Sequence, residues 1–401
     1  MINFDKLTDK VFENTQKLID KHGPRQAGSS ACRNCADDIY EDMKSFADSA
    51  RTEDFGVHTG AFLGWIRLLV AFYALAVIFL WLNIPVASAG LLLLGIIIMV
   101  FQFFLYKHFI DFLFPKKVGR NVVGVVEPKN EVKQQIIISG HHDSAQIFNF
   151  FIHQPKLYAL RVMGGIGLMV TICFLSLVVW AFSLPSWAVT TVAIIGSLGA
   201  LIVLQLWFFA SSKCTPGAGD NLIASCMAVE ALRQISKDKV EGNGLENTRV
   251  IALSFDAEEE GLRGAYAFAK KNKDMLNEVP TYLYNIDCPY NLKDMFFLTS
   301  DINTSVQLSE DFASECRMSA EKLGYKPKVK PIAFLTGGTD AGELAKFGVY
   351  ATTMMAMPWD NTERSSVYHT PNDTCEAVEK EVVKAGLEIF FDMVNEKDKE
   401  I

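Results

Sequence analysis

Residues 250–265 read VIALSFDAEEEGLRGA. An apolar run with the composition of a buried strand ends in Asp256, and glutamates 258–260 follow at once. Carboxylates crowded at the end of a buried strand repel one another and are costly to ionise there. The pattern therefore indicates that something cationic, such as a bound metal ion, neutralises this segment.

Other strand-like segments end in the same kinds of side chain. IIISG is followed by His-His-Asp at 141–143, YLYNI by Asp287, and the loop TPGAGDN places Asp220 just before a helix, while His369 lies in a late loop. In open α/β sheets, ligands bind at the carboxyl ends of the strands. Because histidine nitrogens and carboxylate oxygens are zinc ligands, the sequence predicts a zinc site at this edge.

The polar part of the chain alternates strands and helices, which predicts an α/β fold with a mixed, mostly parallel sheet sandwiched by helices. The predicted strands are 121–128, 134–140, 247–255, 281–287, 295–300 and 350–357. The predicted helices are 221–235, 262–272, 304–324, 341–348 and 375–397.

Four segments are long and apolar enough to cross a bilayer, which needs about 20 residues of helix. They are residues 65–82, 84–106, 162–182 and 187–210, and the only charge within them is Arg67, near the start of the first. Short joins, NIP and SLPS, pair them into two hairpins. Few polar groups lie within the spans, so they predict an anchor rather than a transport pathway.

Short joins put the rest of the chain on one side of the membrane. The basic residues near the spans all lie on that side, which by the positive-inside rule is the cytoplasm, together with both termini and the catalytic domain. We expect a catalytic domain in three pieces, 1–64, 107–157 and 211–401, interrupted by hairpins at 65–106 and 158–210.

Bulk composition excludes some classes of function. The formal net charge of −8 gives no reason to expect nucleic-acid binding. The N-terminus is charged and helical in pattern, unlike a cleavable signal. Eight cysteines without a framework spacing fit a reducing compartment, and Cys32 and Cys35 of the CRNC motif are interpreted as ordinary thiols.

Seven stretches, in order, resemble the co-catalytic, two-zinc aminopeptidase and glutamate carboxypeptidase family of zinc exopeptidases, to which single-zinc glutaminyl cyclases are related. They are PRQAGS, GHHDS, PGAGDN, AEEEGLRGA, NID, GGTDAGELAKFGV and YHTPNDT, and they span nearly all of the polar chain. The resemblance implies the zinc-exopeptidase fold, two zinc ions per chain, and hydrolysis of peptides.

The resemblance also implies roles for individual residues. Zinc would be bound by five side chains, with Asp220 bridging the two ions: His141, Asp220, Glu259, Asp287 and His369. Three further side chains would act in catalysis, Glu258 as general base, Asp143 by orienting His141, and Tyr368 as a hydrogen-bond donor to the tetrahedral intermediate. Glu260 falls at a variable position and is expected to be solvated, while Asp340 would either line the substrate pocket or cap a helix.

The chain departs from the family where the two hairpins replace the usual substrate-selecting loops. The second hairpin lies between His141 and Asp220, and the linker 145–156 before it is rich in phenylalanine, so the active site is expected to face the membrane surface. The sequence thus predicts a membrane-anchored zinc aminopeptidase acting on peptides, with membrane-derived peptides among the expected substrates. The alternatives are glutaminyl cyclase-like acyl transfer, a non-catalytic receptor or scaffold, and a transporter with a regulatory domain. The oligomeric state is not predicted.

Overall fold

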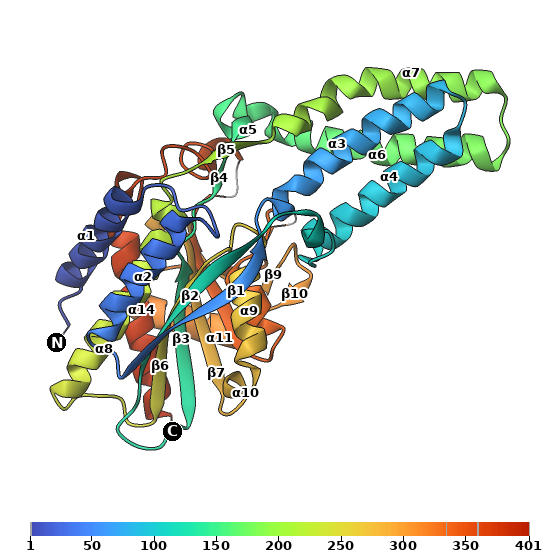
Figure 1. The fold of residues 1–401 in the computed structure, drawn as a ribbon. Helices are drawn as coiled ribbons and strands as arrows, with labels where there is room; N and C mark the ends of the chain where they lie inside the picture. The colour runs from blue at the N-terminus through green and yellow to red at the C-terminus, as the bar shows by residue number, and fades with distance from the viewer. Residues whose placement is uncertain (1, 334, 359–360, 401) are drawn as a thin grey trace.

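A computed structural model describes residues 2–333, 335–358 and 361–400. Its centre is an eight-stranded mixed sheet in the order β1-β2-β6-β3-β7-β12-β8-β11 (Figure 1). The strands are β1 Ser49–His58, β2 Lys116–Val126, β6 Thr248–Phe255, β3 Gln134–His141, β7 Thr281–Pro289, β12 Tyr350–Ala356, β8 Met295–Leu298 and β11 Lys328–Lys330. The four central strands β6, β3, β7 and β12 are parallel to their neighbours in that group.

Helices cover both faces of this sheet, so the predicted fold class is confirmed. One face packs against α2 Ser30–Lys44, α8 Ile223–Val240, α11 Glu310–Lys322 and α14 Lys380–Lys399, with α1 Phe4–His22 outside α8 and α14. The other face carries α9 Arg263–Lys271 and α12 Asp340–Ala345. All residues of β3 and all but Arg249 of β6 are buried, because helices cover both faces of these central strands.

The sequence analysis missed one strand and placed the start of one helix too early. Strand β1 was not predicted, because only two of its ten residues, Glu53 and Val57, are buried and the apolar signal is weak at this edge. The helix predicted at 304–324 begins only at Glu310, since Ser309 caps it by accepting the N–H of Phe312, and residues 306–307 form a short strand instead.

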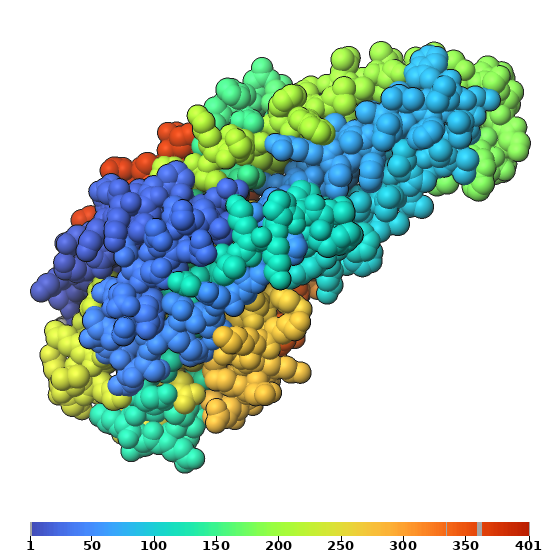
Figure 2. Space-filling view, in the orientation of Figure 1, coloured from blue at the N-terminus to red at the C-terminus, as the bar shows by residue number. Residues whose placement is uncertain are grey.

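Four long apolar helices project from the sheet domain as an arm (Figure 1). They are α3 Ala61–Trp81, α4 Pro85–Met99, α6 Tyr158–Ala181 and α7 Ser186–Val203. With their short extensions, all four are long and apolar enough to cross a membrane. In the space-filling view, the arm and the sheet domain form one elongated surface (Figure 2).

The helices of the arm pack through small residues, as helices do where apolar contacts with lipid and protein are equivalent. Tyr73 of α3 donates its hydroxyl to the carbonyl of Gly196 in α7 at 2.8 Å. A Cβ at Gly199 would lie 2.5 Å from the Tyr73 hydroxyl, so this approach requires glycine. The two hairpins are therefore one bundle rather than two independent anchors.

Candidate metal centre

The sheet brings the sequence-predicted metal donors to one edge. His141 is the last residue of β3, Asp287 lies near the end of β7, and Glu258 and Glu259 follow β6. Asp220 lies in the short turn before α8 and approaches from the side. His369 reaches the same place from a loop just before α14, in a left-handed backbone conformation (φ 53°).

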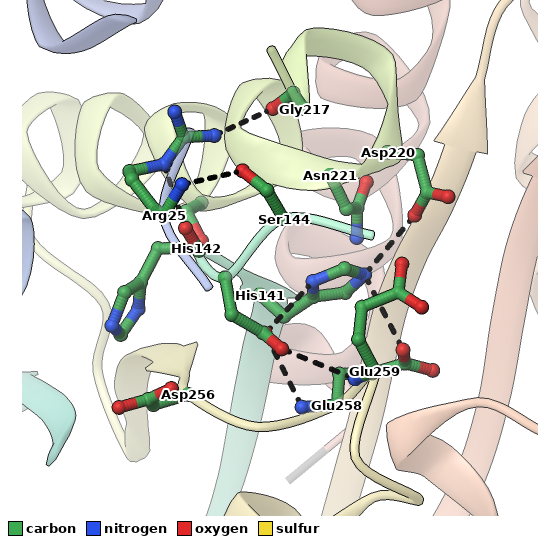
Figure 3. A network of polar contacts seen from close by, with 12 residues as sticks. Arg25, His141, His142, Ser144, Gly217, Asp220, Asn221, Asp256, Glu258 and Glu259 are labelled. Atoms are coloured by element: carbon green, nitrogen blue, oxygen red, sulfur yellow. Dashed lines mark hydrogen bonds and ion pairs between the residues drawn. The ribbon is translucent and has the colours of Figure 1, made fainter. Parts of the chain in front are cut away.

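The Asp220 carboxylate lies between the two histidines. Its Oδ1 is 3.3 Å from His141 Nε2, and its Oδ2 is 3.2 Å from His369 Nε2. The adjacent glutamates divide in the same way, with Glu258 Oε2 3.8 Å from His141 Nε2 and Glu259 Oε1 3.6 Å from His369 Nε2. Figure 3 shows that Asp220 and Glu258 both approach the same ring nitrogen of His141.

Asp287 belongs to the His141 side of this arrangement. Donor atoms of His141, Glu258 and Asp287 lie within 4.8 Å of one another, and so do those of His141, Asp220 and Glu259. The two groups share His141 and lie side by side. Such a donor set of imidazoles and carboxylates has the composition of a zinc site.

Unpartnered polar atoms test whether a metal fits. Among the described residues, both ring nitrogens of His141, Oδ2 of Asp220 and Nδ1 of His369 are buried and satisfy no hydrogen-bond geometry, although carboxylates lie nearby. Buried polar groups without partners are rare and costly. A bound cation would satisfy the donor atoms that converge here, so these residues fit a metal ion.

The pKa shifts of the residues in the site also favour a bound cation. Burial raises the pKa of Glu258 and Glu259 well above the ordinary range, and neighbouring carboxylates add to the effect. Burial opposes protonation of His141, yet Glu258, Asp143 and Asp220 together hold its pKa well above its ordinary value. A bound cation would stabilise the ionised form of these carboxylates. This explains why an acidic run can end a buried strand.

Asp143 holds the metal donors from behind. Its two carboxylate oxygens accept the backbone N–H groups of Glu258 and Glu259, at 3.2 and 3.1 Å. Its Oδ1 also lies 3.2 Å from His141 Nδ1. One buried carboxylate therefore fixes both the imidazole and the turn that carries the glutamates, which is the arrangement expected of an orienting residue.

The sequence analysis assigned no role to Arg25, whose side chain forms hydrogen bonds with several loops next to the site. Its fully buried guanidinium donates to the carbonyls of His142 and Gly217, at 2.8 Å each, and also to those of Gly23 and Pro216 (Figure 3). Arg25 lies in PRQAGS, one of the stretches that carry the family resemblance. The resemblance therefore marked this stretch, but it implied no role for Arg25.

Asp373 was also missed, although it lies in YHTPNDT. It accepts the N–H of Gly219 at 2.8 Å and the hydroxyl of Tyr290 at 2.9 Å. These bonds position the turn that carries Asp220, the residue between the two histidines.

The remaining candidates fall around this centre. Tyr368 is largely enclosed beside the His369 ring (4.0 Å between centroids), and burial raises the pKa of its hydroxyl well above the usual value. His142 points away from the donors and bonds Ser254, and burial lowers its pKa to about 3. Asp340 is not a helix cap, because Thr339 occupies that position, and its Oδ1 is buried without a hydrogen-bond partner among the described residues.

The expectation that Glu260 is solvated is wrong. This residue is buried, and its Oε2 accepts the N–H of Gly60, the residue that precedes α3, at 2.8 Å. Burial raises the pKa of its carboxyl to about 8. The acidic turn is therefore bonded directly to the base of the first apolar hairpin.

The metal donors open into a cavity of about 510 Å³. Asp220, Glu258, Glu259, Asp287 and His369 line one part of it, together with Tyr368. The cavity volume falls in the range of small-ligand sites, about 300–1,000 Å³. A reacting group could therefore meet all these side chains at once.

The site and the fold define the class as a zinc exopeptidase-like α/β protein. Residues 199–394 match the model of peptidase family M28. The structure is similar to a zinc-dependent exopeptidase from Parabacteroides distasonis (15% identity, 96% of each chain, TM-score 0.56). It is equally similar to a leucine aminopeptidase precursor from Bacteroides thetaiotaomicron (10% identity, 96% of each chain, TM-score 0.57).

A glutaminyl cyclase from Porphyromonas gingivalis shares the fold to the same degree (13% identity, 97% of this chain and 98% of that chain, TM-score 0.56). No curated protein sequence matches the chain. The resemblance to the zinc-exopeptidase family is thus confirmed, with the M28 sequence pattern carried by residues 199–394.

Proposed function

We propose that the protein is a membrane-anchored zinc exopeptidase that removes the first residue from peptides with a free amino terminus. The observation that carries the proposal is the Asp220 carboxylate between His141 and His369, at the floor of a cavity that also contains Glu258. We propose that His141, Asp220 and Asp287 hold one zinc ion and Asp220, Glu259 and His369 the other.

Zinc, when bound, polarises the scissile carbonyl and makes a water nucleophilic at neutral pH. Glu258 takes a proton from the attacking water and delivers it to the leaving nitrogen as the carbon–nitrogen bond breaks. It is suited to this task because its carboxylate lies in the cavity wall beside the proposed zinc donors.

Other side chains hold this base and the substrate in place. Asp143 fixes the backbone of Glu258 and Glu259, so the base and its neighbouring donor keep their separation. Tyr368 lies in the cavity wall beside His369, where its hydroxyl can donate to the oxygen that gains negative charge. Both assignments concern this chain's own residues and can be tested separately.

A glutaminyl cyclase activity is the second candidate, because proteins with that name share the fold. The position of Asp220 between two histidines supports two metals and hydrolysis instead. A scaffold role has less support, because the five expected donors converge.

For membrane topology we propose that the four arm helices span the bilayer and that the three catalytic segments, 1–64, 107–157 and 211–401, lie in the cytoplasm. The short joins and the basic residues near the catalytic ends of the helices support this orientation.

The deciding experiment uses detergent-purified protein and matched peptides with free and acetylated amino termini. Loss of the first residue from the free-amine peptide alone, abolished by chelator and by Glu258→Gln, is expected. An amino-terminal glutamine peptide tests the cyclase reaction, which releases ammonia without shortening the chain. Cleavage from the carboxyl terminus, or cyclisation alone, would replace the aminopeptidase assignment.

A further inference from the structure

The cavity that contains the metal donors continues into the helical arm. Beyond the donors its walls come from both hairpins: Phe62 and Trp65 of α3, Val162 and Ile166 of α6, and Leu206 of the segment that ends the second hairpin. A single chamber therefore has a charged floor on the sheet domain and apolar walls on helices suited to a membrane.

The two halves of this chamber favour different chemistry. The floor offers carboxylates and imidazoles for a polar, reacting group. The walls from the arm are mostly apolar. Their hydrogen-bonding groups are the hydroxyls of Tyr106 and Tyr158 and the Trp65 indole N–H, which is buried without a partner among the described residues. A ligand that fills both halves must carry a polar reacting group next to an apolar portion.

A peptide is poorly suited to the apolar half. Each peptide unit carries one N–H and one C=O, and burying them without partners is costly. A hydrocarbon chain has no such groups, and it gains free energy with every methylene removed from water. The walls therefore favour a hydrocarbon chain over a run of amino acids.

We propose that the substrate is an amide that carries one long hydrocarbon chain, with the scissile amide at the metal donors and the chain between α3 and α6. This inference rests on the proposed hydrolytic function and names its substrate class. In the reaction, the water oxygen bonds to the carbonyl carbon, the carbon–nitrogen bond breaks, and a proton passes to the leaving nitrogen, giving a carboxylate and an amine.

The chain could be bonded to either side of the amide, so the test uses two series. In one, leucine with a free amine is joined to n-alkylamines of four to twelve carbons; in the other, leucine carries n-acyl chains of the same lengths. We expect kcat/KM to rise with chain length in one series, by up to about fourfold per methylene held in the chamber. The series that rises identifies the side that carries the chain.

Matched variants locate the chain. Ile166→Trp fills the chamber wall, whereas Val170→Trp places the same side chain one turn farther along α6, where the residue is 45% exposed. We expect Ile166→Trp to remove the rise with chain length, while Val170→Trp keeps the wild-type profile. Both variants are assayed in the same detergent. Partitioning of the substrate into the detergent is therefore the same for both and cannot cause a difference between them. Val162→Trp serves as the second chamber variant if Ile166→Trp does not fold.

Three results would overturn the proposal: no rise in either series, a rise that survives both chamber variants, or faster cleavage of apolar peptides than of any long-chain amide. Failure of the proposed function looks different. In that case not even short amides or peptides are hydrolysed in a manner that depends on Glu258. If such short substrates are hydrolysed but chain length has no effect, only the substrate class is wrong.

Discussion

The ring of Phe148 lies against the ring of His369, with 4.1 Å between their centroids, and the Phe148 N–H donates to the His369 carbonyl at 3.0 Å. Phe148 ends β4 (Gln146–Phe148), in the linker that leads to the second hairpin. One proposed zinc ligand is therefore positioned by the segment that leads into the second apolar hairpin.

Replacing Phe148 by alanine should loosen His369 and weaken zinc binding by about tenfold, as loss of a group that orients a ligand does. Competition with a fluorescent chelator measures this directly. Phe109→Ala is the control, because Phe109 stacks on Phe101 at the surface (5.1 Å between centroids). Unchanged zinc affinity in the Phe148 variant would show that the linker does not position His369.

Asp220 is predicted to hold both metal ions. Wild-type protein should contain about two zinc ions per chain by elemental analysis, and Asp220→Asn should contain at most one, because the amide nitrogen is no zinc ligand and the negative charge is lost. Asp42→Asn, at a surface carboxylate paired with Arg233, should keep the full content. Two tightly held ions in the Asp220 variant would contradict a bridging role.

Glu258→Gln should lower kcat by about 10²- to 10⁴-fold, the usual contribution of a general base. Zinc content should stay at the wild-type level, since we assign metal binding to other residues. Steady-state kinetics and elemental analysis on the same preparation separate the two roles. If zinc is lost together with activity, Glu258 is a metal ligand instead.

Arg25→Met should destabilise the protein and disorder the metal centre. The change leaves four carbonyls without their donor, at a cost of about 1–3 kcal/mol for each one that stays buried and unpaired. Thermal unfolding in detergent measures the loss. Arg317→Met, an arginine on α11 that pairs only with the neighbouring Glu321 among the described residues, is the control and should change little.

Asp301 should make stability depend on pH. Burial raises the pKa of its carboxyl from 3.8 to about 6, although Thr339 and Gly342 donate to it. Folding then takes up a proton, so its contribution to stability is complete below about pH 4 and is lost as the pH rises through about 6. The shift corresponds to roughly 3 kcal/mol.

Asp301→Asn removes this titration, so the difference in unfolding temperature between pH 4 and pH 7 should shrink relative to wild type. Asp311→Asn, at an exposed position of α11, should leave the difference as it is. An equal pH dependence in all three proteins would mean that Asp301 stays ionised when folded.

The sequence was most informative where an ionisable residue directly follows a predicted strand. Four of the five proposed zinc donors follow a strand or precede a helix, which indicated that they share one edge, and the resemblance to the zinc-exopeptidase family added His369 from a loop. Arg25 and Asp373 were assigned no role, because they bind backbone groups of distant loops and no local pattern shows which carbonyl or N–H will lie nearby. Glu260 was misjudged for a related reason, since its partner Gly60 is 200 residues away.

The pairing of strands across the hairpins has a consequence for how the protein is made. Strand β1 precedes the first hairpin and pairs with β2 after it, while β3, which ends in His141, pairs with β6 and β7, both synthesised after the second hairpin. The sheet therefore cannot be completed until the chain beyond both hairpins has been synthesised. A chain that ends before β6 lacks both neighbours of β3 and cannot bring His141 to the other proposed donors.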